Sequence, residues 1–190
     1  MTKEIKDYLL FTARHTISSE LGIKWDGYKG RPALRPKDDE GLKEHKGTFV
    51  TLTMDGELRG CIGQIVPDEN VESTVKENAL SSAFYDPRFA PLRPEEFEKI
   101  KIEISILSKP EEFKYTSTED LLNFLKPKTH GVIIKLGGRS STFLPQVWED
   151  VPSKEEFLTH LCLKAGLGQN EWKSNKLQVF TYTVEHFEEI

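Results

Sequence analysis

Residues 48–65 read TFVTLTMDGELRGCIGQI and predict two antiparallel strands joined by a tight turn. Apolar residues alternate with threonines up to Met54, as in a strand that buries one face. The pair Asp55-Gly56 suits a two-residue type I′ turn, in which both residues take a positive φ. The chain then returns from Leu58 to Ile65, so we expect a β-hairpin here.

Three further segments extend this prediction of antiparallel sheet. Isoleucines alternate with polar residues over residues 100–106, the clearest strand pattern in the chain. Residues 131–144 predict a second hairpin around a pair of glycines. Near the end of the chain, Phe180, Tyr182 and Val184 recur at every second position, which predicts one continuous strand.

Amphipathic segments predict helices beside these strands. Residues 4–21 carry apolar side chains four positions apart, and residues 70–84 show a similar pattern. Thr116 and Glu119 predict a capping box for a short third helix, and a fourth helix is expected over residues 153–165. Hairpins outnumber strand-helix-strand units, so the expected class is α+β, with mainly antiparallel sheets and flanking helices.

Composition and charge exclude several kinds of protein. The 190 residues include 26 Lys and Arg against 31 Asp and Glu, a formal net charge of −5. Nucleic-acid binding is therefore disfavoured, because it depends on a basic surface. No apolar run approaches the roughly 18 residues that span a membrane. The length predicts one domain or two small lobes, without membrane contact.

The cysteines and the start of the chain indicate the compartment. The first residues lack the apolar run and cleavage site of a signal peptide. Cys61 and Cys162 are too few for a disulfide scaffold, so we expect reduced thiols in the cytoplasm. The five histidines show no metal-ligand spacing, so we expect no metal and no cofactor. A histidine partner for Cys61 from elsewhere in the sequence stays open.

The candidate site is the run Leu58-Arg59-Gly60-Cys61-Ile62-Gly63, just beyond the hairpin turn. Glycines let a ligand approach the backbone closely and leave N–H groups that bind anions. Arg59 would add a bidentate donor for a carboxylate or phosphate and favour the thiolate form of Cys61. The pattern predicts a nucleophilic cysteine beside an anion pocket. The structural alternative is a buried cysteine that packs as a small hydrophobe, with glycines that mark a bulge.

Neighbouring segments bear on this site. Arg59 and Cys61 are two positions apart, so they face the same side of a strand unless a bulge intervenes. Asp86 and Arg88 follow the second predicted helix, where Arg88 is a second candidate anion ligand or half of a surface ion pair. Residues 23–46 predict a long loop, which is either a lid or binding loop or a solvated connection.

With these residues the chain resembles the AMMECR family, called AmmeMemoRadiSam system protein A in prokaryotes. The run at residues 58–63 matches the family signature, and residues 86–89 follow at the family's spacing. The other matching segments are residues 47–52, 143–148, 157–158 and 164–167, and Trp172. The resemblance covers about Gly41 to the end of the chain, whereas residues 22–40 match nothing distinctive in the family.

The resemblance implies a single domain over residues 1–190, with two unequal α+β lobes and the signature near a cleft between them. It implies that both chain ends build the larger lobe, and that Memo-like and radical-SAM proteins are partners. The implied site residues are Arg59, Gly60, Cys61 and Gly63, with Asp86 and Arg88 as neighbours.

Two functions follow from these features. One is an enzyme for a small anionic or carbonyl-bearing substrate, with Cys61 as nucleophile or acid/base, Arg59 as charge clamp and glycine amides as oxyanion donors. The other is a non-catalytic module that binds a ligand or a protein partner, with Cys61 merely packed.

Overall fold

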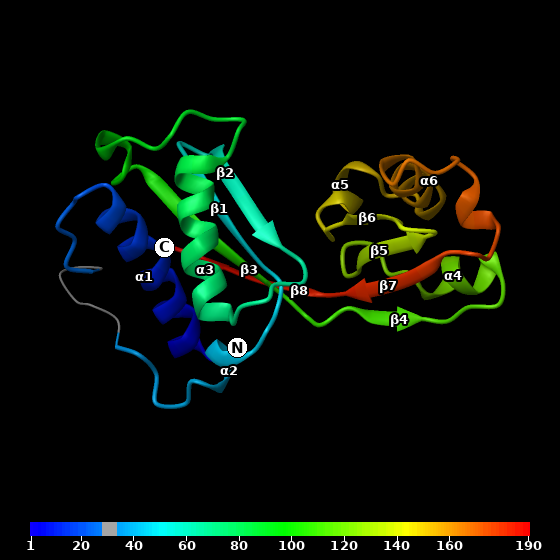
Figure 1. Ribbon diagram of the computed structural model, residues 1–190, viewed down its shortest axis with the longest axis horizontal. Helices are drawn as coiled ribbons and strands as arrows, with labels where there is room; N and C mark the ends of the chain where they lie inside the picture. The colour runs from blue at the N-terminus through cyan, green and yellow to red at the C-terminus, as the bar shows by residue number, and fades with distance from the viewer. Residues whose placement is uncertain (28–33) are drawn as a thin grey trace. The chain divides into compact units, whose positions relative to one another are not determined.

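The computed structural model describes residues 1–27 and 34–190 and shows a chain of two compact units (Figure 1). The first unit comprises Met1–Leu107 and Glu185–Ile190, and the second comprises Ser108–Val184. Each unit has one four-stranded sheet, with strand orders β2-β1-β3-β8 and β4-β7-β5-β6. Helices accompany both sheets, which confirms the predicted α+β class.

The first unit is an antiparallel sheet with two long helices packed against it. Its elements are α1 (Lys3–Glu20), α2 (Glu40–Lys43), β1 (Thr48–Met54), β2 (Glu57–Gln64), α3 (Val71–Leu80), a π-helical turn η1 (Ser81–Tyr85), a 3-10 turn η2 (Pro94–Glu96), β3 (Ile100–Leu107) and β8 (Val184–Glu188). The predicted helix over residues 70–84 therefore ends early, at Leu80, and continues as the π-helical turn.

The β1–β2 hairpin forms as the sequence predicts. Asp55 and Gly56 have φ values of 54° and 84°, the positive values that a type I′ turn requires. β1 also pairs antiparallel with β3, so β1 lies inside the sheet with β2 at one edge. Alternate residues such as Leu52 and Ile102 are buried with the apolar faces of α1 and α3. The intervening residues therefore lie on the opposite face of the sheet.

The loop over residues 23–46 is anchored at several points. Ile23 and Trp25 pack against the core, and Leu42 of α2 is buried in it. In the parts that the structure describes, the predicted loop is thus packed against the core at these residues and contains the short helix α2. Residues 28–33, which fall within this predicted loop, lie outside the described residues.

The second unit contains the other sheet and its own core. Its elements are β4 (Glu111–Phe113), α4 (Thr118–Phe124), β5 (Gly131–Leu136), β6 (Arg139–Phe143), α5 (Val147–Asp150), α6 (Lys154–Lys164), a 3-10 turn η3 (Glu171–Lys173) and β7 (Gln178–Tyr182). β5 and β6 confirm the second predicted hairpin. Trp148 and Phe157 stack at 3.6 Å in the core.

Two further details of the sequence prediction are wrong. The expected last strand is two strands, β7 and β8, which belong to different sheets. The break lies at Thr183, whose backbone N–H and carbonyl bond to Ser108 instead of continuing either ladder. The capping box of α4 uses Ser117 and Asp120, one position beyond the predicted pair, because Ser117 has the extended backbone of an N-cap.

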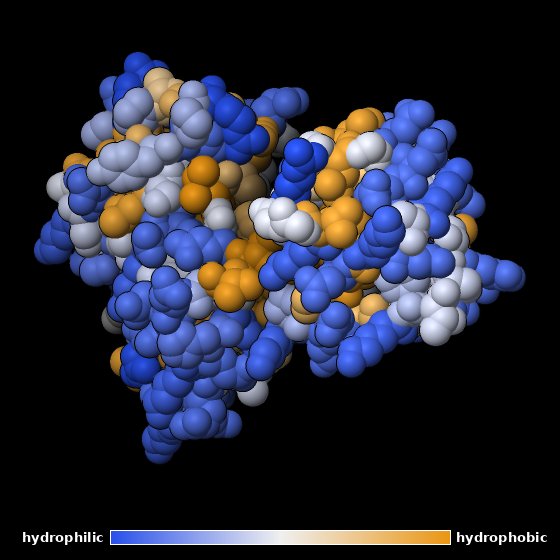
Figure 2. All heavy atoms as spheres, turned by 45° about the vertical axis from the view of Figure 1, so that its right-hand side comes forward, coloured by the Kyte–Doolittle hydropathy of each residue, from blue (hydrophilic) through white to orange (hydrophobic). Residues whose placement is uncertain are grey.

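The helices of the described residues include none that is long and apolar enough to cross a membrane. Hydrophilic side chains cover most of the face shown in Figure 2, with smaller groups of hydrophobic residues between them.

Candidate functional site

Cys61 lies on β2, the edge strand of the first unit's sheet, and its side chain is half-buried. The Thr51 hydroxyl donates a hydrogen bond to its Sγ at 3.2 Å, which places both side chains on the face that α1 and α3 leave uncovered. The thiol is therefore neither a core residue nor fully exposed.

Asp86 connects the backbone of Cys61 to Arg88. Its carboxylate is only 4% exposed and accepts a hydrogen bond from the Cys61 backbone N–H at 2.9 Å. It also accepts from the backbone N–H, Nε and Nη2 of Arg88, at 3.1, 2.9 and 2.7 Å. The Arg88 guanidinium holds the pKa of Asp86 well below its usual range, although burial opposes this, and the two backbone donors add to the effect.

Arg88 is held by this contact while its side chain stays 53% exposed. Its Nη2 also donates to the Cys61 carbonyl oxygen at 3.2 Å. Asp86 raises the pKa of Arg88, and the nearby Cys61 sulfur adds to this. Among the described residues, none accepts a hydrogen bond from Arg88 Nη1, so this edge of the guanidinium can bind an anion.

The π-helical turn packs directly on β2. The Ser82 hydroxyl accepts from the Ile62 N–H at 2.9 Å and donates to the Val50 carbonyl at 2.7 Å, so it bridges two residues that face each other across β1 and β2. A Cβ on Gly60 would lie 2.1 Å from the Ser82 carbonyl oxygen. Gly60 therefore lets the turn approach the strand.

Packing also explains why residue 63 is a glycine, since a Cβ there would lie 2.3 Å from the Phe49 ring. The predicted ligand-binding role of Gly60 and Gly63 stays a prediction. The neighbouring N–H groups of Cys61 and Ile62 are already bonded to side chains, so they are not open oxyanion donors.

Arg59 is bound to a different carboxylate. Its Nε and Nη2 donate to Glu96 at 3.0 and 3.1 Å, which lowers the pKa of Glu96. The β1–β2 register shifts between Leu52 and Thr53, so β2 contains a bulge at Arg59 that interrupts the alternation with Cys61. No hydrogen bond in the described structure joins Arg59 to Cys61.

The register places a third side chain in line with Cys61 and Thr51. Thr51 faces Cys61 on β2 and Glu103 on β3, so the three residues form a row across three strands on the uncovered face. Thr51 and Glu103 are not among the residues predicted for the candidate site. The available signal was the polar series that alternates with the isoleucines of residues 100–106, which marks a face without a core.

Glu103 differs from the other carboxylates that are not exposed in this unit. Its side chain is half-buried and makes no hydrogen bond or ion pair with any residue that the structure describes. The others pair with basic side chains: Asp39 with Lys43, Glu72 with Lys76, Asp86 with Arg88, Glu96 with Arg59 and Glu189 with Arg14.

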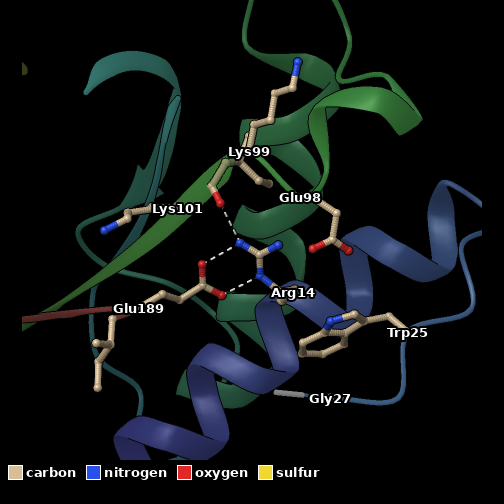
Figure 3. Close-up of a pocket in the computed structure, with 9 residues that line it drawn as sticks. Arg14, Trp25, Gly27, Glu98, Lys99, Lys101 and Glu189 are labelled. Carbon is tan, nitrogen blue, oxygen red and sulfur yellow. Dashed lines mark hydrogen bonds and ion pairs between the residues drawn. The ribbon is translucent and has the colours of Figure 1, made fainter. Parts of the chain in front are cut away.

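A separate cavity of about 390 Å³ lies in the same unit, near Arg14 (Figure 3). Arg14 donates to the Glu189 carboxylate and to the carbonyls of Phe97 and Ile100, and both charged side chains are buried. Figure 3 shows the Lys99 side chain extending away from this pair. The two buried charges at this cavity, Arg14 and Glu189, pair with each other, whereas Glu103 has no such partner among the described residues.

Metal and histidine ligands do not accompany Cys61. The described residues contain no group of three or more His, Cys, Asp or Glu that could hold a metal ion. Thr51 is the side chain that bonds to Sγ, and no described histidine does so. Cys162 is fully buried in the second unit, where burial raises its thiol pKa.

Comparison with known proteins identifies a matching family and several relatives. A family model described as AMMECR1 matches residues 10–187. Protein MK0488 of Methanopyrus kandleri is 36% identical, with 100% of this chain and 90% of the relative covered. A protein of Aquifex aeolicus is 38% identical, with 87% and 86% covered.

A solved structure shares the fold. The crystal structure of the uncharacterized protein PH0010 from Pyrococcus horikoshii matches with a TM-score of 0.80 and 33% sequence identity. The match covers 100% of this chain and 93% of that one. The names of these relatives state no activity.

Proposed function

This chain belongs to the AMMECR1 family, and from that premise we propose that it binds a small anionic, carbonyl-bearing ligand on the uncovered sheet face beside Cys61. Arg88 is the anchor for the ligand's negative charge. The two free cysteines suit a reduced thiol at this site and a cytoplasmic location.

The observation that carries the proposal is the set of hydrogen bonds that the Asp86 carboxylate accepts. A buried carboxylate that accepts four hydrogen bonds fixes the Arg88 guanidinium and the Cys61 backbone relative to each other. Such an arrangement reduces the entropy lost when a ligand binds, because the guanidinium is already oriented. Asp86 and the Cys61 carbonyl take the hydrogens of Nε and Nη2, so Nη1 is the donor left for the carboxylate of a ligand.

Ligand binding at Arg88 explains the arrangement of this site better than an oxyanion hole built from the backbone N–H groups of residues 58–63. The Cys61 and Ile62 N–H groups are occupied, and Arg59 is paired with Glu96. These groups thus hold the strand and its turn in place, whereas Arg88 keeps an exposed donor edge for a ligand.

Calorimetric titration with oxalate tests this proposal. Oxalate is a small dianion whose carbonyl carbons resist addition by a thiol, so it reports binding alone. We expect saturable binding that weakens about tenfold or more in Arg88→Ala, as expected for loss of a charged hydrogen bond. Arg93→Ala is the matched control, since the Arg93 side chain is 74% exposed. Absence of oxalate binding, or equal affinity in Arg88→Ala, would contradict the proposal.

A second candidate is recognition of a partner protein at the same edge. Tyr85 is 72% exposed and directly precedes Asp86, so a tyrosine and an arginine project from one short segment. These two residue types dominate the energetics of protein interfaces. Memo-like and radical-SAM proteins are the proposed partners, on the resemblance alone. Loss of co-purification in Tyr85→Ala, with oxalate binding retained, would favour this candidate.

A further inference from the structure

We propose that the ligand is an aldehyde or ketone, that the Cys61 thiol adds reversibly to its carbonyl carbon, and that Glu103 transfers the proton. This inference rests on the proposed function, because it requires a ligand on the sheet face that carries Cys61. It adds the chemical class of the ligand, a covalent step and two further residues, Thr51 and Glu103.

The row Cys61–Thr51–Glu103 supplies the geometry. Residues directly opposite each other in antiparallel strands have Cβ atoms about 5 Å apart. Thr51 is opposite both Cys61 and Glu103, so a small molecule over Thr51 meets the thiol on one side and the carboxylate on the other. The Thr51 hydroxyl donates to Sγ and fixes the sulfur in this row.

Glu103 is suited to accept a proton because no basic side chain in the described structure pairs with it. Asp86 lies nearer to the Cys61 backbone but is unsuited to this role. It already accepts four hydrogen bonds, and Arg88 holds its pKa well below the usual range. The other carboxylates of this unit that are not exposed are each paired with a basic side chain, so Glu103 is the one in the described residues that stays unpaired and reachable from the sheet face.

Ser105 adds a further polar group to this face. It lies two residues beyond Glu103 on β3, and it is only 5% exposed. Its hydroxyl has no hydrogen-bond partner among the described residues. None of the fully buried side-chain nitrogen and oxygen atoms in the described residues lacks a hydrogen-bond partner, so the unbonded Ser105 oxygen retains access to solvent and can bond to a polar atom of a ligand. Phe49, which faces Ser105 in the register, lies over Gly63 and provides an apolar wall.

The reaction balances without an oxidant, a reductant or a second substrate. A bond forms between Sγ and the carbonyl carbon, and the π bond of the carbonyl opens toward its oxygen. The thiol proton moves through one bridging water to Glu103, because the two side chains stand on strands on either side of β1. Glu103 then donates a proton to that oxygen, which becomes the hydroxyl of a hemithioacetal, or of a hemithioketal from a ketone. Thr51 acts as a positioning residue, because it holds the sulfur and does not exchange the transferred proton.

Carbon-13 NMR with labelled glyoxylate tests the step on the full chain. Glyoxylate carries a carboxylate for Arg88 and an aldehyde for Cys61, and a hemithioacetal carbon has its own chemical shift. The variants are Cys61→Ser, Glu103→Gln, Thr51→Val and Thr51→Ser, with Glu57→Gln as a control carboxylate at the exposed start of β2. Stopped-flow mixing measures the rate of addition separately from the amount of adduct at equilibrium.

We expect a saturable adduct in the wild type and none in Cys61→Ser, which should still bind oxalate. Glu103→Gln should slow addition about a hundredfold and leave the equilibrium fraction of adduct unchanged, because a proton-transfer group changes only the rate. Thr51→Val should also slow addition, and Thr51→Ser should restore it. Glu57→Gln should match the wild type.

Other outcomes overturn this inference. An adduct that persists in Cys61→Ser would assign the addition to another nucleophile. Wild-type rates in Glu103→Gln would remove Glu103 from proton transfer. If oxalate and glyoxylate bind but no adduct forms, the covalent step is wrong and the proposed function stands. If neither compound binds, the proposed function itself fails.

Discussion

The Asp86 carboxylate accepts a hydrogen bond from the Cys61 backbone N–H at 2.9 Å, although the two residues are 25 positions apart. This bond joins the π-helical turn and the loop after it to the edge strand of the sheet. It explains why the Asp86–Arg88 segment accompanies the signature run in this chain, since each fixes the conformation of the other.

Replacement of Asp86 should destabilise the first unit in a pH-dependent way. Asp86→Asn should lower the free energy of unfolding by about 2 kcal/mol at pH 7, as expected for loss of hydrogen bonds to a charged group. The pKa of Asp86 is lowered in the folded state, so its contribution is complete above the unfolded-state pKa of about 4. The contribution then decreases as the pH falls toward the folded-state pKa.

Urea unfolding at pH 7, 4 and 3, followed by circular dichroism, measures this difference. The exposed Asp68→Asn is the control and should change little at each pH. A difference between Asp86→Asn and the wild type that is the same at pH 7 and pH 3 would argue against the paired carboxylate.

Gly60 should tolerate no side chain. Gly60→Ala places a Cβ 2.1 Å from the Ser82 carbonyl oxygen, a backbone atom that moves only if the π-helical turn moves. We expect a loss of about 2 kcal/mol in thermal or urea unfolding. Gly168→Ala is the matched control, since no atom lies within 4 Å of its Cβ position, and it should change stability by less than about 0.5 kcal/mol. Equal effects of the two substitutions would refute the close approach.

The two thiols should react at different rates in the native protein. Cys61 is half-buried, whereas Cys162 is fully buried and burial raises its pKa. Iodoacetamide at pH 8 should label Cys61 at least about tenfold faster, because access and thiolate fraction control alkylation. Peptide mass spectrometry measures both sites in one sample, and unfolding in urea should equalise them. Faster labelling of Cys162 in the folded protein would show that the exposure of Cys61 is misassigned.

The buried ion pair between Arg14 and Glu189 should be a major contributor to stability. Glu189 accepts from Arg14 and from the Ile102 backbone N–H, so it ties the end of the chain to α1 and β3. Glu189→Ala should cost about 3–5 kcal/mol, because it leaves a buried guanidinium charge without its carboxylate. The exposed neighbour Glu188→Ala serves as the control in the same unfolding assay. A loss below about 1 kcal/mol would mean that water compensates the charge.

Sequence patterns predicted the elements that depend on local signals. The β1–β2 turn follows from Asp55-Gly56, because few other pairs accept two positive φ values. The strand over residues 100–106 follows from its alternation of isoleucines with polar residues. The break at Thr183 was not predicted, since apolar alternation continues across it and only the pairing partners change.

Local sequence patterns single out only some residues of the candidate site. Cys61, Asp86 and Arg88 could be found from sequence, and the structure brings all three into contact. The pairing of Arg59 with Glu96 and the row through Thr51 to Glu103 depend on a bulge and on strand register. Register is set by contacts between distant segments, so a single sequence does not specify it.

The measurement that tests the binding face most directly is an amide NMR titration of the whole chain with oxalate. We expect shifts to concentrate at residues 49–51, 61–63, 86–89 and 103–105, and Arg88→Ala to require about tenfold more oxalate, or more, for the same shifts. Shifts that concentrate instead around Glu98 and Lys99, at the cavity in Figure 3, would contradict the assignment of the ligand site. Absence of shifts at saturating oxalate would contradict the account as a whole.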